Sequence, residues 1–245
     1  MRLFGLIGFP LIHSFSKQYF DEKFEKEKIT ECQFQNFALS HISEIKILVK
    51  NNPNLIGLAV TIPYKKKVMH YLNNASEDVI KMVACNCIKI ENGKLHGFNT
   101  DIIGFEESLK QKLSSHHLKA LILGTGGAAS AVEFVLNKKH IPSLFVSRNV
   151  LGKSKTISYA DINKSILNEY SLIVNTTPVG TFPNINECPN IPYHLLSNRN
   201  HLFDVIYNPD KTLFLQKGEG QGCVIQNGYE MLTIQAEANW EIWNL

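Results

Sequence analysis

The chain has 245 residues, of which 44% are hydrophobic and 19% are charged, an ordinary composition for a globular protein. Its formal net charge of +3 is too small to indicate nucleic acid as a partner, and no apolar run approaches the roughly 20 residues that cross a bilayer. Pro10 follows Met1 too closely for a signal peptide, so we expect a cytoplasmic location and no membrane partner.

The five cysteines are odd in number and scattered along the chain, which argues against a disulfide framework in a protein of this size. We therefore expect reduced thiols. Cys85 and Cys87 form a closely spaced pair, but no second Cys or His pair with zinc-binding spacing accompanies them. No metal site is expected.

The first hundred residues alternate short apolar runs with amphipathic stretches, and this pattern predicts a mixed α/β domain. Strands are expected at residues 3–7, 33–39, 55–61, 87–91 and 95–97. The last two flank Asn92-Gly93, a pair that favours a hairpin turn. Helices are expected at residues 16–27 and 43–50, after Pro63, and at 76–82.

A helix at residues 102–113 opens the second part, where strands and helices alternate again. Strands are expected at residues 119–123, 143–147, 172–175, 202–206 and 223–226. A terminal helix is expected at 230–243, with Met231, Ile234, Ala238 and Ile242 on its apolar face. This alternation of strands and helices predicts a Rossmann-like sheet. Two domains are therefore expected. One consists of residues 1–100 together with the C-terminal helix 229–245, and the other consists of residues 101–228.

A glycine-rich segment, Gly124-Thr125-Gly126-Gly127-Ala128-Ala129, directly follows one of these strands and opens a helix that is expected to reach residue 137. Gly124 permits a tight turn, Gly126 lets a pyrophosphate approach the backbone, and the small Ala129 allows close packing of helix on strand. The amide groups at the start of the helix then face the anion. The segment predicts a dinucleotide site, and an ordinary strand-to-helix turn is the alternative.

The residues after the next strand, Ser147-Arg148-Asn149, indicate which dinucleotide is bound. An NAD site usually has a carboxylate here, about 20 residues after the glycines, that binds the ribose hydroxyls. This chain has none, and Arg148 offers a planar, permanently charged partner for the 2′-phosphate of NADP, with Lys153 as a second cation. The alternative is that Arg148 is a solvated loop residue.

Four polar clusters interrupt the apolar segments of the first domain, each expected just after a strand, where open α/β sheets bind ligands. Lys65 is the nearest to the strand end of three successive lysines, so it is expected to lean into a cleft, while Lys66 and Lys67 project into water. The clusters together predict one site for a small polar molecule. Its candidate side chains are Ser14, Ser16, Thr61, Lys65, Asn86 and Asp101.

Some of these residues also have a purely structural interpretation. Ser14, Ser16 or Asp101 could cap the start of a helix, and Asn86 could hold a turn. In the terminal helix, Gln235 interrupts the apolar face, and its amide needs a partner that a bound ligand would provide.

Taken together, these segments resemble the shikimate dehydrogenase family almost from end to end, and residues 175–180, 204–209 and 228–236 look like its remaining blocks. The resemblance implies an N-terminal substrate-binding catalytic domain of mixed α/β type and a C-terminal Rossmann-like NADP domain. It also implies that the last helix returns to the first domain. The implied reaction is the reversible NADPH-dependent reduction of 3-dehydroshikimate to shikimate, in aromatic amino-acid (chorismate) biosynthesis.

Carried over position by position, the resemblance implies that Lys65 and Asp101 are the catalytic pair. The ammonium group would stabilise the charge that develops on the carbonyl oxygen and deliver a proton, and Asp101 would orient it. The implied substrate-binding residues are Ser14, Ser16, Thr61, Asn86, Asp101, Tyr207 and Gln235. The implied cofactor-binding residues are Gly124, Thr125, Gly126, Gly127, Ala128, Arg148, Lys153, Thr176 and Gly228. The expected partners are these two small molecules, and the protein is expected to be a monomer or homodimer.

The chain departs from the family pattern at three places, with Lys17 where proline is usual, Ala59 where asparagine is usual and Cys87 where threonine is usual. Ser147 and Asn149 also replace the family's asparagine and threonine, which leaves the strength of NADP preference open. Two alternatives remain: a quinate or quinate/shikimate dehydrogenase with NAD or relaxed cofactor use, and a catalytically silent nucleotide-binding sensor. Retention of both proposed catalytic residues disfavours the sensor.

Overall fold

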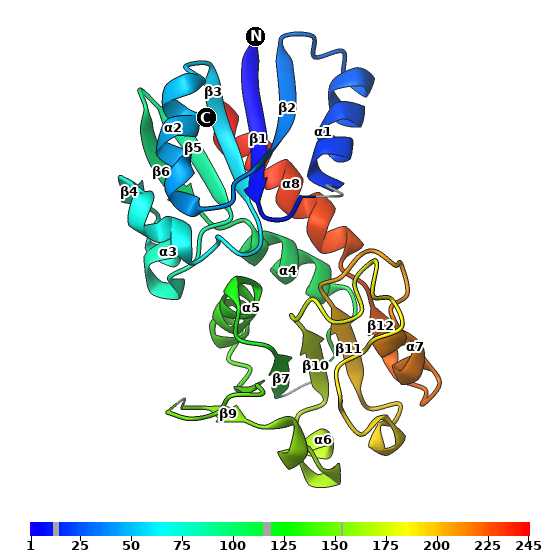
Figure 1. Ribbon diagram of the computed structural model, residues 1–245. Helices are drawn as coiled ribbons and strands as arrows, with labels where there is room; N and C mark the ends of the chain where they lie inside the picture. Colours follow the sequence, from blue (N-terminus) through cyan, green and yellow to red (C-terminus); the bar gives the residue numbers. More distant parts are fainter. Residues whose placement is uncertain (12–14, 115–118, 153) are drawn as a thin grey trace. The chain divides into compact units, whose positions relative to one another are not determined.

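A computed structural model describes residues 1–11, 15–114, 119–152 and 154–245 (Figure 1). The chain divides into two compact units, one made of Met1–Thr100 with Ala236–Leu245 and the other of Asp101–Gln235. Each unit is built on its own six-stranded sheet with helices on its faces. The predicted fold class, a mixed α/β unit and a Rossmann-like unit, is confirmed.

The sheet of the first unit is mixed. Its strands are β1 (Arg2–Gly8), β2 (Cys32–Ala38), β3 (Leu55–Val60), β4 (Asn74–Ala75), β5 (Cys87–Glu91) and β6 (Lys94–Phe98), in the order β2-β1-β3-β5-β6-β4. β1 is parallel to both neighbours, whereas β5 is antiparallel to β3 and β6. The predicted hairpin is confirmed, because Asn92 and Gly93 join β5 to β6 with φ values of 51° and 74°, as an Asn-Gly turn requires.

Successive side chains of each strand point to opposite faces, so both faces of this sheet carry apolar side chains. Helices cover both faces and bury these side chains. The helices are α1 (Phe15–Lys26), α2 (Ile45–Asn51), α3 (Glu77–Met82) and the end of α8 (Tyr229–Asn244), with 3-10 turns η1 (Ile42–Glu44) and η2 (Lys67–Tyr71). Phe4 of β1 lies in one core with Phe20 of α1 and Trp243 of α8. Leu3 and Ile7 lie in the other core, with α2, η2 and α3. The helix expected after Pro63 is thus only a 3-10 turn, which begins at Lys67.

Every pair of neighbouring strands in the second unit is parallel. The strands are β7 (Ala120–Leu123), β8 (Ser143–Val146), β9 (Thr156–Ile157), β10 (Leu172–Asn175), β11 (His201–Asp204) and β12 (Val224–Gln226), in the order β12-β11-β10-β7-β8-β9. The helices are α4 (Asp101–Lys110), α5 (Gly127–Lys138), α6 (Lys164–Glu169) and α7 (Leu213–Glu219), with 3-10 turns η3 (Tyr159–Asp161) and η4 (Tyr193–Leu195). All carboxyl ends of the strands therefore lie at one edge of the sheet.

Aromatic and aliphatic side chains hold these helices to the sheet. The rings of Phe105 in α4 and Phe203 in β11 meet edge to face at 5.0 Å. The beginning of α8 also belongs to this unit, because a Cβ added to Gly104 of α4 would lie 2.4 Å from the carbonyl oxygen of Met231. The division therefore falls inside α8, with residues 229–235 in the second unit, rather than before residue 229 as expected.

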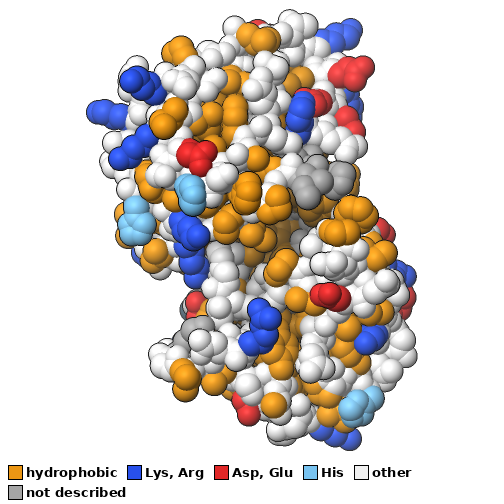
Figure 2. Space-filling model, viewed as in Figure 1, with side chains coloured by type: hydrophobic (Ala, Val, Ile, Leu, Met, Phe, Trp, Pro, Cys, Tyr) orange, Lys and Arg blue, Asp and Glu red, His pale blue; other side chains and the backbone are white. Residues whose placement is uncertain are grey.

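The surface and the cysteines agree with the composition. On the face shown in Figure 2, Lys and Arg side chains of the described residues are scattered among apolar and acidic ones. All five cysteines are free thiols, as predicted. Within the described ranges, no helix is long and apolar enough to span a membrane, and no group of three or more His, Cys, Asp and Glu side chains is placed to hold a metal ion.

Candidate active site

Polar groups gather at one edge of the first unit's sheet. The register pairs Ile7 with Val60, Ala59 with Cys87, and Cys87 with Phe98, so the ends of β1, β3 and β6 lie beside the start of β5. The expectation that every polar cluster follows a strand is wrong for the cluster of Asn86, which precedes β5. It still reaches the common edge, because β5 runs antiparallel to β3.

The backbone around Lys65 is fixed from several sides. The amide of Cys85 donates to the carbonyl oxygen of Lys65 at 2.8 Å, and the amide of Thr61 donates to the carbonyl oxygen of Ile7 at 2.9 Å. The buried hydroxyl of Tyr64 donates to the carbonyl oxygen of Leu39 at 2.5 Å. Lys65 itself is half-buried, whereas the next two lysines are exposed, in agreement with the expected difference among the three.

Asn86 is buried and belongs to a network that reaches α8. Its Oδ1 accepts from the backbone amide of Thr100 at 2.7 Å, and its Nδ2 donates to the hydroxyl of Thr100 at 3.0 Å. That hydroxyl donates to Oδ1 of Asn239 in α8 at 2.7 Å. The side chain of Asn86 is therefore held by Thr100, while its backbone is bonded to Val60 and Phe98 of the neighbouring strands. The roles of Thr100 and Asn239 were missed, although Asn239 follows Gln235 by one helical turn and could have been found as a second amide on the same face.

Of the other residues predicted to bind the substrate, Ser16 and Asp101 lie at helix starts, whereas Gln235 lies within α8. Ser16 is half-buried in the first turn of α1, so it is not the residue before the helix, and Ser14 lies outside the described residues. Asp101 is buried, directly follows Thr100 and is the first residue of α4 rather than its cap. Gln235 is buried in α8 and donates to the carbonyl oxygen of Leu232 at 3.0 Å.

The buried face of α8 differs from the expected apolar one. Met231 and Ala238 are buried, but Ile234 and Ile242 are only partly so. The two amide residues, Gln235 and Asn239, are buried in their place, along with Ala236 and Trp243. Polar groups on this face are thus part of the interior and need hydrogen-bond partners there.

Two of the departures from the family pattern are partners of each other. Ala59 of β3 lies opposite Cys87 of β5 in the antiparallel ladder, and both are buried in the core that contains Trp243. A small apolar pair therefore stands where the family has a polar pair. The third departure, Lys17, forms an ion pair with Asp21 one turn along α1, at 2.6 Å.

In the second unit, the glycine turn joins β7 to α5 at the carboxyl edge of the sheet. Gly124 has a φ of +109°, and a Cβ there would lie 2.9 Å from Oγ1 of Thr176, so the turn requires glycine. Ala129 is fully buried where α5 meets the sheet. The roles assigned to Gly124 and Ala129 in the local fold match this geometry.

Gly126 differs from Gly124, because its own packing does not require glycine. It is the N-cap of α5, and among the described residues no side chain caps the helix start and no atom would lie within 4 Å of a Cβ on Gly126. The protein's own packing thus leaves this space open beside the first-turn amides of Gly127 and Ala128, which have no partner within the helix. These residues, with Thr125 exposed between the glycines, fit the pyrophosphate of a dinucleotide.

Arg148 is exposed in the loop after β8. The Ser147 hydroxyl accepts from the Asn149 amide at 3.2 Å, and Oδ1 of Asn149 accepts from the Leu151 amide at 3.2 Å, so the loop has a defined turn. Burial raises the pKa of Tyr159 while the nearby Arg148 charge lowers it, which puts the guanidinium near that phenol. Lys153 lies outside the described residues.

A buried network links the ends of β10 and β11. Asp204 is fully buried and accepts from Nδ2 of Asn175 at 3.1 Å, from the Ile206 amide at 3.1 Å and from the Thr212 hydroxyl at 2.6 Å. Burial nevertheless raises the pKa of Asp204 to about 6. This network was missed, because its strands are 29 positions apart and only their pairing brings Asn175 to Asp204.

The remaining predicted residues surround this network. The Thr176 hydroxyl donates to the carbonyl oxygen of Leu123 at 2.6 Å, which ties the end of β10 to the glycine turn. Tyr207 is half-buried in the segment after β11. Gly228 is buried, and a Cβ there would lie 2.2 Å from the carbonyl oxygen of Val205, so packing alone requires glycine at this position.

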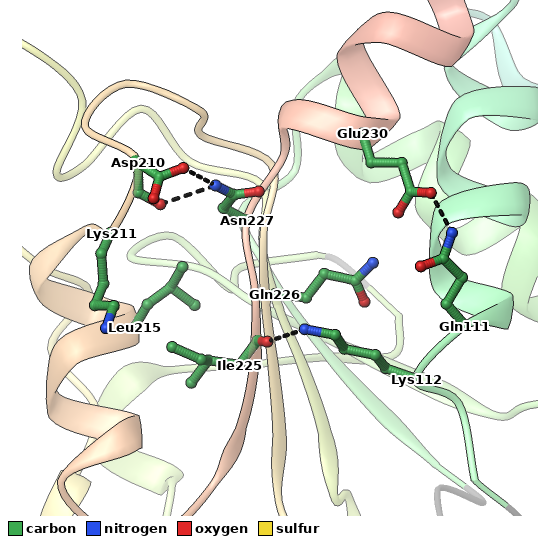
Figure 3. Close-up of a pocket in the computed structure, with 9 residues that line it drawn as sticks. All are labelled: Gln111, Lys112, Asp210, Lys211, Leu215, Ile225, Gln226, Asn227 and Glu230. Atoms are coloured by element: carbon green, nitrogen blue, oxygen red, sulfur yellow. Dashed lines mark hydrogen bonds between the residues drawn. The ribbon is translucent and has the colours of Figure 1, made fainter.

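A surface cavity of about 330 Å³ lies elsewhere in this unit, beside the edge strand β12 and three strands from the glycine turn (Figure 3). Several of its polar side chains bind one another or the backbone. Lys112 donates to the carbonyl oxygen of Ile225 at 2.9 Å, Gln111 donates to Glu230, and Asn227 donates to Asp210 at 2.6 Å. The first two bonds join the segment after α4 to β12 and to the start of α8. These polar groups therefore hold neighbouring elements together, and we assign no ligand to the cavity.

A parallel sheet with a glycine turn before an uncapped helix defines a dinucleotide-binding unit, and the first unit adds a lysine and a buried asparagine at one sheet edge. Together they are typical of a two-domain, nicotinamide-dependent oxidoreductase. The family model described as the shikimate dehydrogenase substrate binding domain matches residues 6–88.

Known proteins extend this likeness to the whole chain. A shikimate dehydrogenase (NADP(+)) of Methanococcus maripaludis is 37% identical over 258 residues, which cover 99% of this chain and 91% of that protein. The crystal structure of shikimate dehydrogenase 1 from Peptoclostridium difficile is 34% identical with a TM-score of 0.87, covering 100% of this chain and 92% of that one. Shikimate 5-dehydrogenase of Thermus thermophilus, in complex with NADP(H) and shikimate, is 26% identical with a TM-score of 0.85, covering 99% and 93%. The chain belongs to the shikimate dehydrogenase family.

Proposed function

We propose that this chain catalyses the reversible, NADPH-dependent reduction of 3-dehydroshikimate to shikimate. The observation that carries the proposal is identity of 37% to an NADP-dependent shikimate dehydrogenase across almost the entire chain. The chain also has Lys65 and Asp101, the two ionisable groups to which we assign the catalysis. The Thermus thermophilus relative binds both shikimate and NADP(H), which supports the same pair of ligands here.

The proposed chemistry uses charge and proton transfer at one carbonyl group. Bound NADPH supplies a hydride to the carbonyl carbon of 3-dehydroshikimate. As the carbon–oxygen double bond becomes single, negative charge develops on the oxygen, and the Lys65 ammonium stabilises that charge and delivers the proton that completes the hydroxyl. Asp101 orients the ammonium. The overall reaction consumes one NADPH and one proton and releases NADP⁺.

The substrate would be held by hydroxyl and amide groups suited to a carboxylate and several hydroxyls. We assign this role to Ser14, Ser16, Thr61, Asn86, Asp101, Tyr207 and Gln235. Thr61 and Asn86 support the assignment most directly, because they lie at the same edge of one sheet as the segment of Lys65.

The cofactor would lie along the carboxyl edge of the second sheet. We assign its pyrophosphate to the turn of Gly124, Thr125, Gly126, Gly127 and Ala128, and its 2′-phosphate to Arg148 and Lys153. Thr176 and Gly228 are assigned to the neighbouring strand ends. The open space at Gly126 is the feature that most favours this assignment.

Absorbance of the reduced nicotinamide tests the proposal. The purified chain is mixed with NADP⁺ or NAD⁺ and with shikimate or quinate, and the reverse reactions use their oxidised forms. We expect the highest kcat/KM with shikimate and NADP⁺. Preference for quinate or NAD⁺ would favour the related dehydrogenase instead, and absence of turnover with all pairs would favour a nucleotide-binding sensor.

A further inference from the structure

Three buried polar side chains of the first unit form a continuous hydrogen-bonded chain. Asn86, Thr100 and Asn239 are only 2%, 0% and 1% exposed. They come from the segment before β5, the segment after β6 and the last part of α8, with Thr100 and Asn239 139 positions apart. These buried groups cannot bond to water, so each donor and acceptor must find its partner within the protein. This requirement determines which group donates and which accepts in each bond of the network.

The direction follows from the one group whose role is fixed. The backbone amide of Thr100 can only donate, so the Asn86 atom 2.7 Å away is the carbonyl oxygen Oδ1. Nδ2 of Asn86 therefore faces the Thr100 hydroxyl at 3.0 Å, and the hydroxyl oxygen accepts from it.

The single hydroxyl proton of Thr100 then needs an acceptor. It has two neighbours, Oδ1 of Asn239 at 2.7 Å and Oδ1 of Asn86 at 3.3 Å. The shorter bond is the better one, and Oδ1 of Asn86 already accepts from the amide. The bonds thus run one way, from Asn86 through Thr100 to Asn239.

From this chain we infer that Asn239 is a positioning residue, which acts through Thr100 to fix the amide of Asn86. The inference rests on the proposed function, in which Asn86 binds the substrate. Without the acceptor on Asn239, the Thr100 hydroxyl turns its proton toward Oδ1 of Asn86, 3.3 Å away, and the bond that it accepts from Nδ2 of Asn86 weakens. Oδ1 is still held by the Thr100 amide, but the plane of the Asn86 amide is held less firmly, and part of the binding free energy is used to order it again.

Other contacts hold α8 in place, so this bond is not what attaches the helix. A Cβ at Gly57 of β3 would lie 2.4 Å from the indole ring of Trp243, and Trp243 donates to the carbonyl oxygen of Ile88 at 3.1 Å. Replacement of the Asn239 side chain should therefore leave the helix packed. Its expected effect is on the orientation of Asn86.

The test compares substrate affinity with stability in the full-length chain. We expect Asn239→Leu, which removes the acceptor, to raise the KM for shikimate about tenfold while the KM for NADP⁺ stays unchanged. Asn239→Asp keeps an acceptor oxygen but buries a charge, so it should lower the melting temperature more than Asn239→Leu while keeping the KM for shikimate nearer to wild type.

A double-mutant cycle identifies the route of the effect. Thr100→Val breaks the same chain by a nearly isosteric change, so we expect it to raise the KM for shikimate as Asn239→Leu does. The double variant should be no worse than the single ones. Asn244→Leu is the matched control, because Asn244 is an exposed asparagine of the same helix, and it should leave both KM values unchanged.

The outcomes separate this inference from the proposed function. Wild-type protein without activity on shikimate would overturn both. An active wild type whose KM for shikimate is unchanged in Asn239→Leu would overturn the inference alone. So would KM values that follow the melting temperatures, with Asn239→Asp the most impaired, or fully additive effects in the cycle.

Discussion

The two sheets of this protein present polar groups at an edge in different ways. In the second unit all strands are parallel, so each loop at the carboxyl edge follows a strand, and the glycine turn exposes backbone amides. In the first unit the sheet is mixed, and its edge collects side chains from both ends of strands, with Lys65 after β3 and Asn86 before β5.

This difference predicts how each edge responds to substitution. A surface made of backbone amides tolerates most changes and fails where a new side chain fills the ligand's space. A surface made of side chains depends on the chemistry of each one, and the fold can survive their loss. Substitutions at the first edge should therefore reduce turnover or substrate affinity, and those at the second should reduce cofactor affinity.

The largest expected effect is at Lys65. We expect Lys65→Ala to lower kcat by about 10²–10⁴-fold, the usual contribution of a positioned proton donor, with little change in the KM for NADPH. Because Lys65 is only half-buried, the melting temperature should change little. Lys66→Ala is the matched control, since Lys66 is exposed next to it and should keep wild-type kinetics. Turnover in Lys65→Ala equal to that of wild type would reject the catalytic assignment.

The second largest effect is expected at the glycine turn. Because a Cβ on Gly126 would meet no atom of the described residues within 4 Å, Gly126→Val should fold normally but raise the KM for NADPH about tenfold or more by filling the space of the pyrophosphate. Gly124→Ala is the contrasting variant, with a strained φ of +109° and a close contact, so it should lower the melting temperature. Normal NADPH affinity in Gly126→Val would show that the open space does not receive the cofactor.

The same difference explains what could be predicted from the sequence. The glycine turn was predictable because strand, glycines and helix are continuous in the chain, and the hairpin at Asn92-Gly93 was predictable for the same reason. The short elements α6, α7 and β9, of 6, 7 and 2 residues, were not predicted. Length alone does not explain this, because α2 and α3 are equally short and were predicted.

Features that depend on pairing between distant segments could not be predicted from local sequence patterns. Pairing with β3 sets the antiparallel direction of β5. This direction brings Asn86 to the sheet edge at which β3 ends and after which Lys65 lies. The bond between Thr100 and Asn239 and the bond between Asn175 and Asp204 both join residues far apart in the chain. Most of the predicted ligand groups came from the polar clusters and the glycine turn, and the resemblance to a family added their roles, whereas the network that supports them came from the structure.

Cofactor selectivity offers a smaller and sharper test of the second edge. Arg148→Ala should lower kcat/KM with NADPH about tenfold, because one charged hydrogen-bond partner of the 2′-phosphate is lost, and should leave kcat/KM with NADH unchanged. Arg199→Ala removes an exposed arginine of the same unit and should alter neither value. Equal losses with both cofactors would mean that Arg148 supports the loop rather than the phosphate.

The smallest expected effect concerns Asp204, the buried carboxylate beneath the second edge. Its pKa of about 6 in the folded protein is above the ordinary value of 3.8, because burial disfavours the charged form. The folded state therefore binds this proton more tightly than the unfolded state does. The resulting stabilisation is fully present below about pH 4 and is lost as the pH rises through 6.

Two variants isolate this contribution. Asp204→Asn cannot titrate, so the melting temperature of wild type minus that of Asp204→Asn should increase by a few degrees between pH 7 and pH 5. Thr212→Val keeps the carboxyl group but removes the 2.6 Å bond to it. Its cost should be larger at pH 7, where the ionised carboxylate accepts a stronger hydrogen bond. A pH-independent difference for both variants would contradict the raised pKa, and the second edge would then depend on Asp204 only as a hydrogen-bond acceptor.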